Sequence, residues 1–251
     1  MKIKVTSNEF IPELAFILCY PYISEEEYWA RLKELQSLNV KEIELDGPIK
    51  LGSINVIGKG YRGIIVKAYH NGKLYALKIR RVDCEKESLE DEALYNKIAN
   101  GIGVGPSLFK YSRNFILREF IDGINLVQWL KRTKRDVIKH TVRDMLFQAF
   151  KLDMIGLDHG ELARPVKHIL ITKDNRPFII DFESASLRRR VHNLTSLTQY
   201  LFLRDNIVRR RIEEELGKWD KSQLILALRN YKRIPSLRTF RSILRALNIN
   251  K

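Results

Sequence analysis

Side chains suited to phosphate and metal chemistry occur in two separate stretches of this 251-residue sequence. The first contains the glycine-rich run Gly58–Gly63 and, further along, Lys78. The second runs from Asp158 to His168 and is followed by Asp181. Glycine-rich loops let backbone N–H groups approach phosphate oxygens, lysine supplies a positive charge, and carboxylate and imidazole groups bind divalent ions. Together these residue types predict a site for a nucleotide phosphate and a metal ion.

The glycine run fits the pattern GxGxxG, and the residues after it indicate which kind of phosphate loop it forms. Gly63 leads directly into the strand-forming residues 64–66 and then to Asn71-Gly72, a dipeptide that favours a tight hairpin turn. The glycines therefore join strand to strand, as in a flap over nucleotide phosphates, and not strand to helix, as in a dinucleotide-binding fold. A glycine-rich hairpin without a ligand is the alternative. The residues assigned to phosphate are Gly58, Lys59, Gly60 and Gly63.

Lys78 lies in an apolar strand, Tyr75–Ile79, that is expected to be largely buried. A buried ammonium group is costly without a partner, so we expect phosphate oxygens and a carboxylate beside it. The following helix, predicted over residues 86–99, offers several acids, and Glu92 borders its apolar face because Ala93 is adjacent. We therefore expect Glu92 to pair with Lys78. The alternative is that Lys78 extends from an edge strand into solvent.

A second hairpin, predicted over residues 169–180, carries candidate metal ligands at its open end. If residues 173–176 form a four-residue turn, the register places His168 opposite Asp181, with Cβ atoms about 5 Å apart. An imidazole and a carboxylate at that separation could share a divalent ion. Chance placement of two polar residues at the strand ends is the alternative.

The order of the predicted elements indicates the fold class. The first 50 residues contain one amphipathic helix, capped at its start by Ser24. Strands then dominate to about residue 120, apart from the helix over 86–99. Helices dominate from Leu126 onward, apart from the second hairpin. Strands first and helices afterwards are typical of an α+β protein with two lobes.

Composition and charge limit the classes of function. Hydrophobic residues make up 45% of the chain, and no apolar run approaches the roughly 20 residues that cross a bilayer. The sequence therefore predicts a cytoplasmic protein with no membrane partner, and Cys19 and Cys84 lack the spacing of a disulfide or metal framework. Residues 1–50 have a net charge of −3, whereas residues 188–251 have +11. That basic region favours RNA or a ribonucleoprotein as partner, or it is a solvated surface without one.

The glycine run, Lys78 and Glu92 resemble the glycine loop, strand lysine and helix glutamate of protein kinases, in the same order and at similar spacing. The resemblance implies that Lys78 holds the α- and β-phosphates of ATP and that Glu92 orients it. Residues 115–123 then resemble the hinge between the kinase lobes. The residues whose backbone would bind adenine there are Glu119 and Ile121.

Residues 181–183, Asp-Phe-Glu, resemble the kinase Asp-Phe-Gly, whose aspartate binds Mg²⁺. Residues 159–161, His-Gly-Glu, resemble the His-Arg-Asp or His-Gly-Asp that opens the catalytic loop. The roles implied by this resemblance are metal binding by Asp181 and His168, and catalysis by Lys78 with either Glu161 or Asp158 as the base.

Four positions depart from the kinase pattern. Glu161 stands in place of the usual aspartate, and its longer side chain shifts the reach of the base. His168 replaces an asparagine, and imidazole is a softer ligand that favours Mn²⁺ over Mg²⁺. Glu183 replaces the glycine that permits a flipping switch. Arg118 falls at the rear of the adenine pocket, where the residue is usually apolar or small.

No Ala-Pro-Glu and no long activation segment follow residue 181. The shortened second lobe resembles the RIO and KEOPS-complex kinases and the small archaeal serine/threonine kinases, over about residues 52–200. The implied fold is a two-lobed protein-kinase-like fold, with a β-rich N-lobe and a reduced helical C-lobe. The expected parts are an N-terminal helical extension at 1–50, an N-lobe at 51–122 and a C-lobe at 123–251.

Three functions are compatible with these features. The first is an ATP-dependent, atypical serine/threonine protein kinase whose substrate is a protein, itself included. The second is a small-molecule kinase of the aminoglycoside-phosphotransferase type, although such enzymes usually carry an acidic pocket and the C-terminal third here is basic. The third is a nucleotide-switched module that binds RNA or a ribonucleoprotein.

Overall fold

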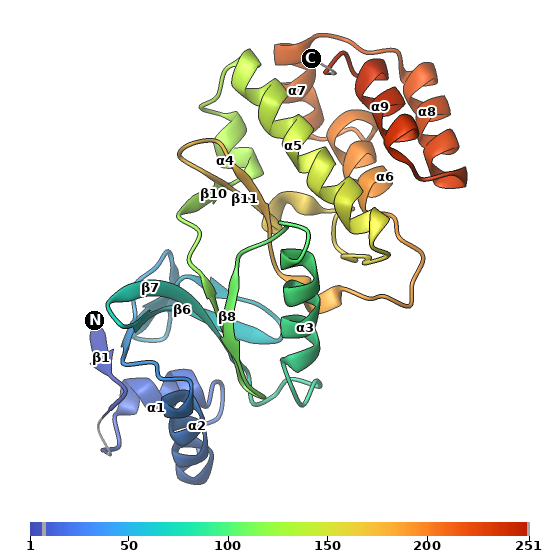
Figure 1. Cartoon of the computed structure of the whole chain (residues 1–251). Coiled ribbons are helices and arrows are strands. Elements are labelled where there is room, and N and C mark those ends of the chain that lie inside the picture. Colours follow the sequence, from blue (N-terminus) through green and yellow to red (C-terminus); the bar gives the residue numbers. More distant parts are fainter. Residues whose placement is uncertain (7–8, 250–251) are drawn as a thin grey trace. The chain divides into compact units, whose positions relative to one another are not determined.

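The computed structural model describes residues 1–6 and 9–249, and the chain divides into two compact units (Figure 1). The first, here called the N-unit, comprises Met1–Lys97 and Pro106–Phe120. The second, the C-unit, comprises Ile98–Gly105 and Ile121–Lys251. Strands dominate the N-unit and helices dominate the C-unit, so the predicted mixed α+β class is confirmed.

The N-unit is built on a seven-stranded antiparallel sheet with the order β1-β2-β6-β7-β9-β8, in which β5 also pairs with β6. The short strands β3 and β4 form a separate hairpin. The strands of the N-unit are β1 (Lys2–Lys4), β2 (Glu42–Glu44), β3 (Ile49–Leu51), β4 (Ile54–Val56), β5 (Gly58–Lys59), β6 (Gly63–His70), β7 (Lys73–Arg80), β8 (Leu108–Tyr111) and β9 (Phe115–Glu119).

The predicted hairpin of β6 and β7 is confirmed, and it lies in the middle of this sheet. Asn71 and Gly72 have φ angles of 49° and 74°, the left-handed conformations that a two-residue hairpin turn requires. This turn sets the register so that Ile65 pairs with Lys78. The strand that carries the candidate lysine is therefore an interior strand, flanked by β6 and β9.

The first 50 residues, expected as a helical extension, contribute both helices and strands to the N-unit. Helix α1 spans Pro12–Leu18 and α2 spans Glu25–Ser37, and the Ser24 side chain caps α2 by accepting a hydrogen bond from the Glu27 amide. Strands β1 and β2 extend the sheet beyond β6.

Helix α3 (Glu90–Asn100) begins later than predicted, after Ser88, whose hydroxyl accepts a hydrogen bond from the Glu90 amide.

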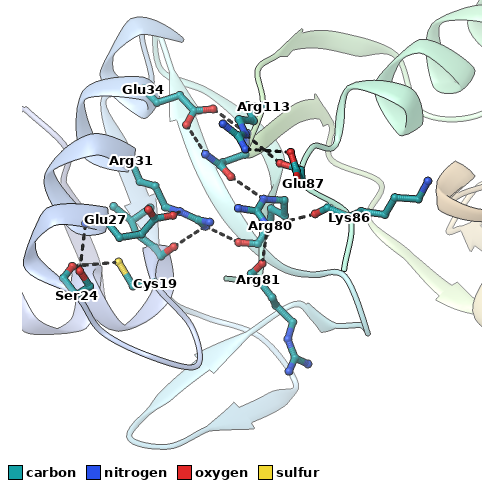
Figure 2. Close-up of polar contacts among 12 residues, drawn as sticks. Cys19, Ser24, Glu27, Arg31, Glu34, Arg80, Arg81, Lys86, Glu87 and Arg113 are labelled. Carbon is teal, nitrogen blue, oxygen red and sulfur yellow. Dashed lines mark hydrogen bonds and ion pairs between the residues drawn. The ribbon is translucent and has the colours of Figure 1, made fainter. Parts of the chain in front are cut away.

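A buried arginine joins α2 to the end of β7 (Figure 2). The Arg31 side chain is 1% exposed, and its Nη1 donates to the carbonyl oxygens of Leu18, at 2.8 Å, and of Arg80, at 2.5 Å. Arg80 in turn donates to the Asn114 side chain, which also donates to Glu34 of α2. These bonds connect α2 with the strand that carries the candidate lysine.

The C-unit combines a small three-stranded sheet with a set of helices. Helix α5 supplies much of its core, through apolar residues that recur at helical spacing from Ile138 to Leu152. Its elements are β10 (Gly123–Asn125), α4 (Leu126–Leu130), α5 (Arg135–Met154), η1 (Pro165–Lys167), β11 (Ile169–Thr172), β12 (Pro177–Ile179), η2 (Phe182–Ser184), α6 (Asn193–Thr198), the π-helical turn η3 (Gln199–Leu203), α7 (Ile207–Leu216), α8 (Lys221–Arg233) and α9 (Leu237–Ala246).

Within residues 1–6 and 9–249, no helix combines the length and the apolar character needed to cross a bilayer.

Replacing Arg31 is expected to destabilise the N-unit. Arg31→Ala leaves buried carbonyl oxygens without donors, so the free energy of unfolding should fall by about 2–4 kcal/mol in urea titrations followed by circular dichroism. Arg113→Ala is the matched control, because the ion pair of Arg113 with Glu87 is exposed and should contribute less than about 1 kcal/mol. Equal unfolding midpoints for the two variants would contradict the anchoring role of Arg31.

Candidate functional site

The N-unit contains a buried carboxylate that faces two buried cations. Lys78 Nζ of β7 donates to both carboxylate oxygens of Glu92 on α3, at 2.9 and 2.8 Å. Arg118 Nη1 of β9 lies 3.7 Å from Glu92 Oε1. All three side chains are 4% exposed. The structure thus brings together the lysine and the glutamate chosen from the sequence, and it adds Arg118, which the sequence placed nearby without a role toward Glu92.

The last glycine of the loop lies against the stem of Lys78. A Cβ atom added to Gly63 would lie 2.8 Å from the Ile79 carbonyl oxygen and 3.1 Å from Lys78 Cε, so a larger residue would push the loop away from the lysine. The loop itself closes tightly, because the Gly60 amide donates to the Gly63 carbonyl oxygen at 2.8 Å. Gly58, at the other end of the loop, pairs with Ile65 of β6.

Two basic side chains contact the region of the glycine loop, and one of them, Arg81, is also paired with Asp83. The Lys59 ammonium group donates to the Tyr20 hydroxyl at 2.7 Å and lies 5.0 Å from the centre of that ring. Arg81 donates to the Gly60 carbonyl oxygen at 3.3 Å, and its amide donates to the Arg62 carbonyl oxygen. Tyr20, which follows the end of α1 by two residues, is a contact that the sequence did not reveal.

The two residues expected to bind adenine lie where the chain passes from one unit to the other. Glu119 is the last residue of β9, and its carboxylate accepts a hydrogen bond from the Ser107 amide at 3.1 Å. Ile121 is the first residue of this segment that is assigned to the C-unit. The adenine-binding role of both residues remains a prediction.

In the C-unit, the two candidate bases differ in how their carboxylates are used. Asp158 Oδ2 accepts a hydrogen bond from Arg189, at 3.1 Å, and its Oδ1 accepts one from the His192 amide, at 3.3 Å. The Asp158 backbone also forms a two-bond bridge with Ser186. Glu161 is half-buried, and its Oε1 accepts a hydrogen bond from the Ser184 hydroxyl at 2.9 Å. Asp158 is therefore the more fully engaged of the two.

His159 is a fully buried, neutral support of the loop. Its Nε2 lies 3.1 Å from the Ile180 carbonyl oxygen, which can only accept, so Nε2 carries the proton. Its Nδ1 then accepts from the Glu161 amide at 3.4 Å. Burial is the main cause that lowers the pKa of His159 to about 4, with a smaller contribution from His168. Gly160 has φ +87°, and a Cβ there would lie 2.7 Å from the Ser184 carbonyl oxygen.

A buried polar centre that the sequence analysis missed holds this loop in place. Asp153, near the end of α5, accepts hydrogen bonds from the Asn193 amide and side chain at 3.0 and 2.9 Å, and from the Tyr231 hydroxyl at 2.8 Å. Asn193 in turn donates to the Leu157 carbonyl oxygen and accepts from the His159 amide. Burial raises the pKa of Asp153. The sequence does contain one signal for this centre, because Asp153 is an acidic residue within the apolar pattern of α5.

The predicted register of the second hairpin is wrong by one residue. Ile169 pairs with Ile179 and Ile171 with Pro177, so His168 lies opposite Ile180 and not opposite Asp181. The reason is that the turn contains residues 173–175 and not 173–176. The Thr172 amide donates to the Arg176 carbonyl oxygen, and Asn175 adopts the left-handed conformation, with φ 63°, that reverses the chain.

His168 and Asp181 nevertheless lie near each other. Asp181 adopts φ 69° and ψ 78°, which turns the chain out of the strand direction. His168 Nδ1 is then 4.0 Å from Asp181 Oδ2. Within the described residues, this nitrogen is buried and has no hydrogen-bond partner. A nitrogen and a carboxylate oxygen at this separation fit a transition-metal or Mg²⁺ site, so both predicted metal ligands remain candidates.

The buried imidazole of His159 is expected to make stability depend on pH. Its pKa of about 4 in the folded protein lies below the ordinary value of 6.5, so the unfolded chain binds a proton first as the pH falls. This contribution to stability is complete above pH 6.5 and is lost between pH 6.5 and pH 4. Its loss between pH 7 and pH 5 amounts to about 2 kcal/mol.

Urea unfolding at both pH values, in EDTA, tests this expectation. His159→Gln should lower stability at pH 7 and flatten the pH dependence, because no imidazole remains to be protonated. His140→Gln, at an exposed position of α5, is the control and should keep the wild-type dependence. A His159→Gln profile as steep as that of the wild type would show that other groups cause it.

Comparison with known proteins relates the chain to an archaeal protein. No family model matches the chain. An uncharacterized protein of Methanocaldococcus jannaschii, MJ1211, is 34% identical over 84 residues, a match that covers 34% of this chain and 71% of that protein. Identity at this level over most of the shorter protein indicates common descent. The chain therefore belongs to the same family as MJ1211 of M. jannaschii.

Proposed function

We propose that the protein is an ATP-dependent phosphotransferase, in which the N-unit and the C-unit are the two lobes of a protein-kinase-like fold. Its reaction would transfer the γ-phosphoryl group of ATP to a serine or threonine hydroxyl of a protein. The observation that carries the proposal is the buried Lys78–Glu92 pair beside Gly63. A buried ion pair adds little to stability by itself, whereas an oriented ammonium group beside a glycine loop is what phosphate binding requires.

The N-unit would bind the nucleotide. Glu92 holds the Lys78 ammonium group in one orientation through two hydrogen bonds, and the oriented group would donate to an α- or β-phosphate oxygen of bound ATP. The tight turn between Gly60 and Gly63 favours close approach of the loop backbone to phosphate. The residues assigned to phosphate are Gly58, Lys59, Gly60, Gly63 and Lys78, and those assigned to adenine are Glu119 and Ile121.

The C-unit would supply the metal ligands. Asp181 and His168 fit this role because the His168 Nδ1 nitrogen is buried without a hydrogen-bond partner in the described part of the chain and lies near a carboxylate. The mixed nitrogen and oxygen donors suit Mn²⁺ at least as well as Mg²⁺. The bound ion would neutralise charge on the phosphates during transfer.

Glu161 is the better candidate for the base. One of its carboxylate oxygens accepts from Ser184, which fixes the side chain, and it could accept the proton of a substrate hydroxyl. Asp158 already accepts from Arg189 and from the His192 amide, so it is suited to holding the segment after residue 184 in place. The proton lost by the attacking hydroxyl would therefore move to Glu161.

The Lys78 assignment is tested with ATP labelled in the γ-phosphate, with Mg²⁺ or Mn²⁺ and the purified protein. Lys78→Met should lower transfer of label at least 100-fold, because the phosphates lose their oriented cation. Lys73→Met is the matched control, since Lys73 is an exposed residue of the same strand, and it should retain full activity. Wild-type transfer by Lys78→Met would overturn the proposal. If a cell extract is added, label on a metabolite in place of protein would indicate a small-molecule kinase.

The two carboxylates are separated by a second pair of variants. Glu161→Gln should lower the transfer rate by roughly 10²–10⁴-fold while ATP binding and melting temperature stay near wild type, because only the proton acceptor is lost. Asp158→Asn should instead lower the melting temperature, because its hydrogen bonds to residues 189 and 192 weaken. If Asp158→Asn abolished transfer in a stable protein and Glu161→Gln did not, the roles would be reversed.

A further inference from the structure

The last two helices carry a concentration of positive charge that forms no ion pair within residues 1–6 and 9–249. Residues 221–249, which include α8 and α9, contain seven basic residues and no acidic residue. Every one of the seven side chains is exposed. The two helices pack against each other in the C-unit, where they lie beside each other in Figure 1. The basic residues are Lys221, Arg229, Lys232, Arg233, Arg238, Arg241 and Arg245.

The preceding helix, α7, is also rich in arginine, but its arginines are paired with acidic residues. In α7, Arg210 pairs with Asp205 at 2.7 Å and Arg211 pairs with Glu215 at 2.5 Å, and Arg209 also pairs with acidic neighbours. Across residues 1–6 and 9–249, by contrast, no ion pair involves any basic side chain of 221–249. The charge of α7 is compensated within the protein, and that of α8 and α9 is left for solvent or a partner.

On α9 the basic residues form a stripe. Arg238, Arg241 and Arg245 are three and four positions apart, so they share one face of the helix. Like charges at this spacing oppose each other and destabilise a helix slightly. The charges of the stripe therefore repel one another within the helix, and an anionic partner would remove that repulsion.

The stripe borders a groove with an aromatic wall. A groove of about 470 Å³ lies between α5 and α9 and is lined by Arg241 and Arg245 on one side and by Arg143 and Phe147 on the other. The Phe147 side chain is 43% exposed. Its ring stacks on Phe150, which in turn stacks on Phe240 of α9, so the exposed ring is held in place by two aromatic neighbours. Asp144 is the acidic residue among those lining the groove.

We propose that this groove and the arginine stripe bind single-stranded nucleic acid. Guanidinium groups on both walls would contact successive phosphates, and an unpaired base would stack on Phe147. A duplex keeps its bases inside and could not use the exposed ring in this way. An acidic peptide could neutralise the arginines, but the carboxylate side chains of Asp and Glu have no ring that would stack on Phe147. The proposal holds independently of the proposed phosphotransferase activity.

Fluorescence anisotropy with a labelled 12-nucleotide oligo(U) or oligo(dT), without ATP, measures this binding. Arg241→Gln/Arg245→Gln should weaken binding at least tenfold and reduce the slope of log affinity against log salt by about 1.4, since two phosphate contacts are lost. Arg210→Gln/Arg211→Gln removes the same charge from α7 and is the matched control, expected to stay within twofold of wild type. Melting temperatures check that both variants are folded.

The stacking contact is tested separately from the charge. Phe147→Ala should weaken oligonucleotide binding roughly tenfold and leave the salt slope unchanged, because no charge is removed.

Equal loss of affinity in the α7 control would overturn the proposal, since total charge would then decide binding. Equally tight binding of a duplex, or displacement by poly-glutamate at the same charge concentration, would also overturn it and indicate a duplex or an acidic protein partner.

Discussion

The contact between Lys78 and Glu92 is the constraint on which the proposed nucleotide site depends. Both side chains are almost fully buried, and burial of two charges is tolerated only when their geometry is well defined. That geometry needs β7 to be an interior strand, α3 to lie over it, and a glycine at position 63, where any side chain would collide with the strand. Arg31 also helps to hold β7 in place, because it donates a hydrogen bond to the carbonyl oxygen of Arg80, the last residue of that strand (Figure 2).

A second buried polar system organises the C-unit. Asp153 and Asn193 hold the backbone at Leu157 and His159, and neutral His159 connects this loop to Ile180, next to Asp181. The groups that would carry chemistry, Glu161 and Asp181, are therefore positioned by buried residues: Asp153, His159 and Asn193. Each hydrogen bond inside such a network gains strength from the low dielectric around it, and each unpaired group would be correspondingly costly.

The distribution of charge separates two kinds of basic surface in one region of the chain. Arginines of α7 form ion pairs with acidic residues three to five positions away along the chain, so their charge is neutralised locally. Arginines of α9 have no such neighbours and border a groove with an exposed ring. A net charge of +11 over residues 188–251 does not distinguish these cases, because the distinction depends on which side chains meet.

Local sequence signals determined the parts of this protein that depend on near neighbours. The turn at Asn71-Gly72, the cap at Ser24 and the pairing of Lys78 with a carboxylate on the next helix could all be predicted, because each follows from backbone conformation or from the cost of one buried charge. Tertiary structure alone decided what depends on distant segments: the entry of β1 and β2 into the sheet, and the Asp153–Asn193–Tyr231 centre. It also decided the one-residue shift that separates His168 from the strand position opposite Asp181, since a turn can lose a residue whenever packing favours the resulting register.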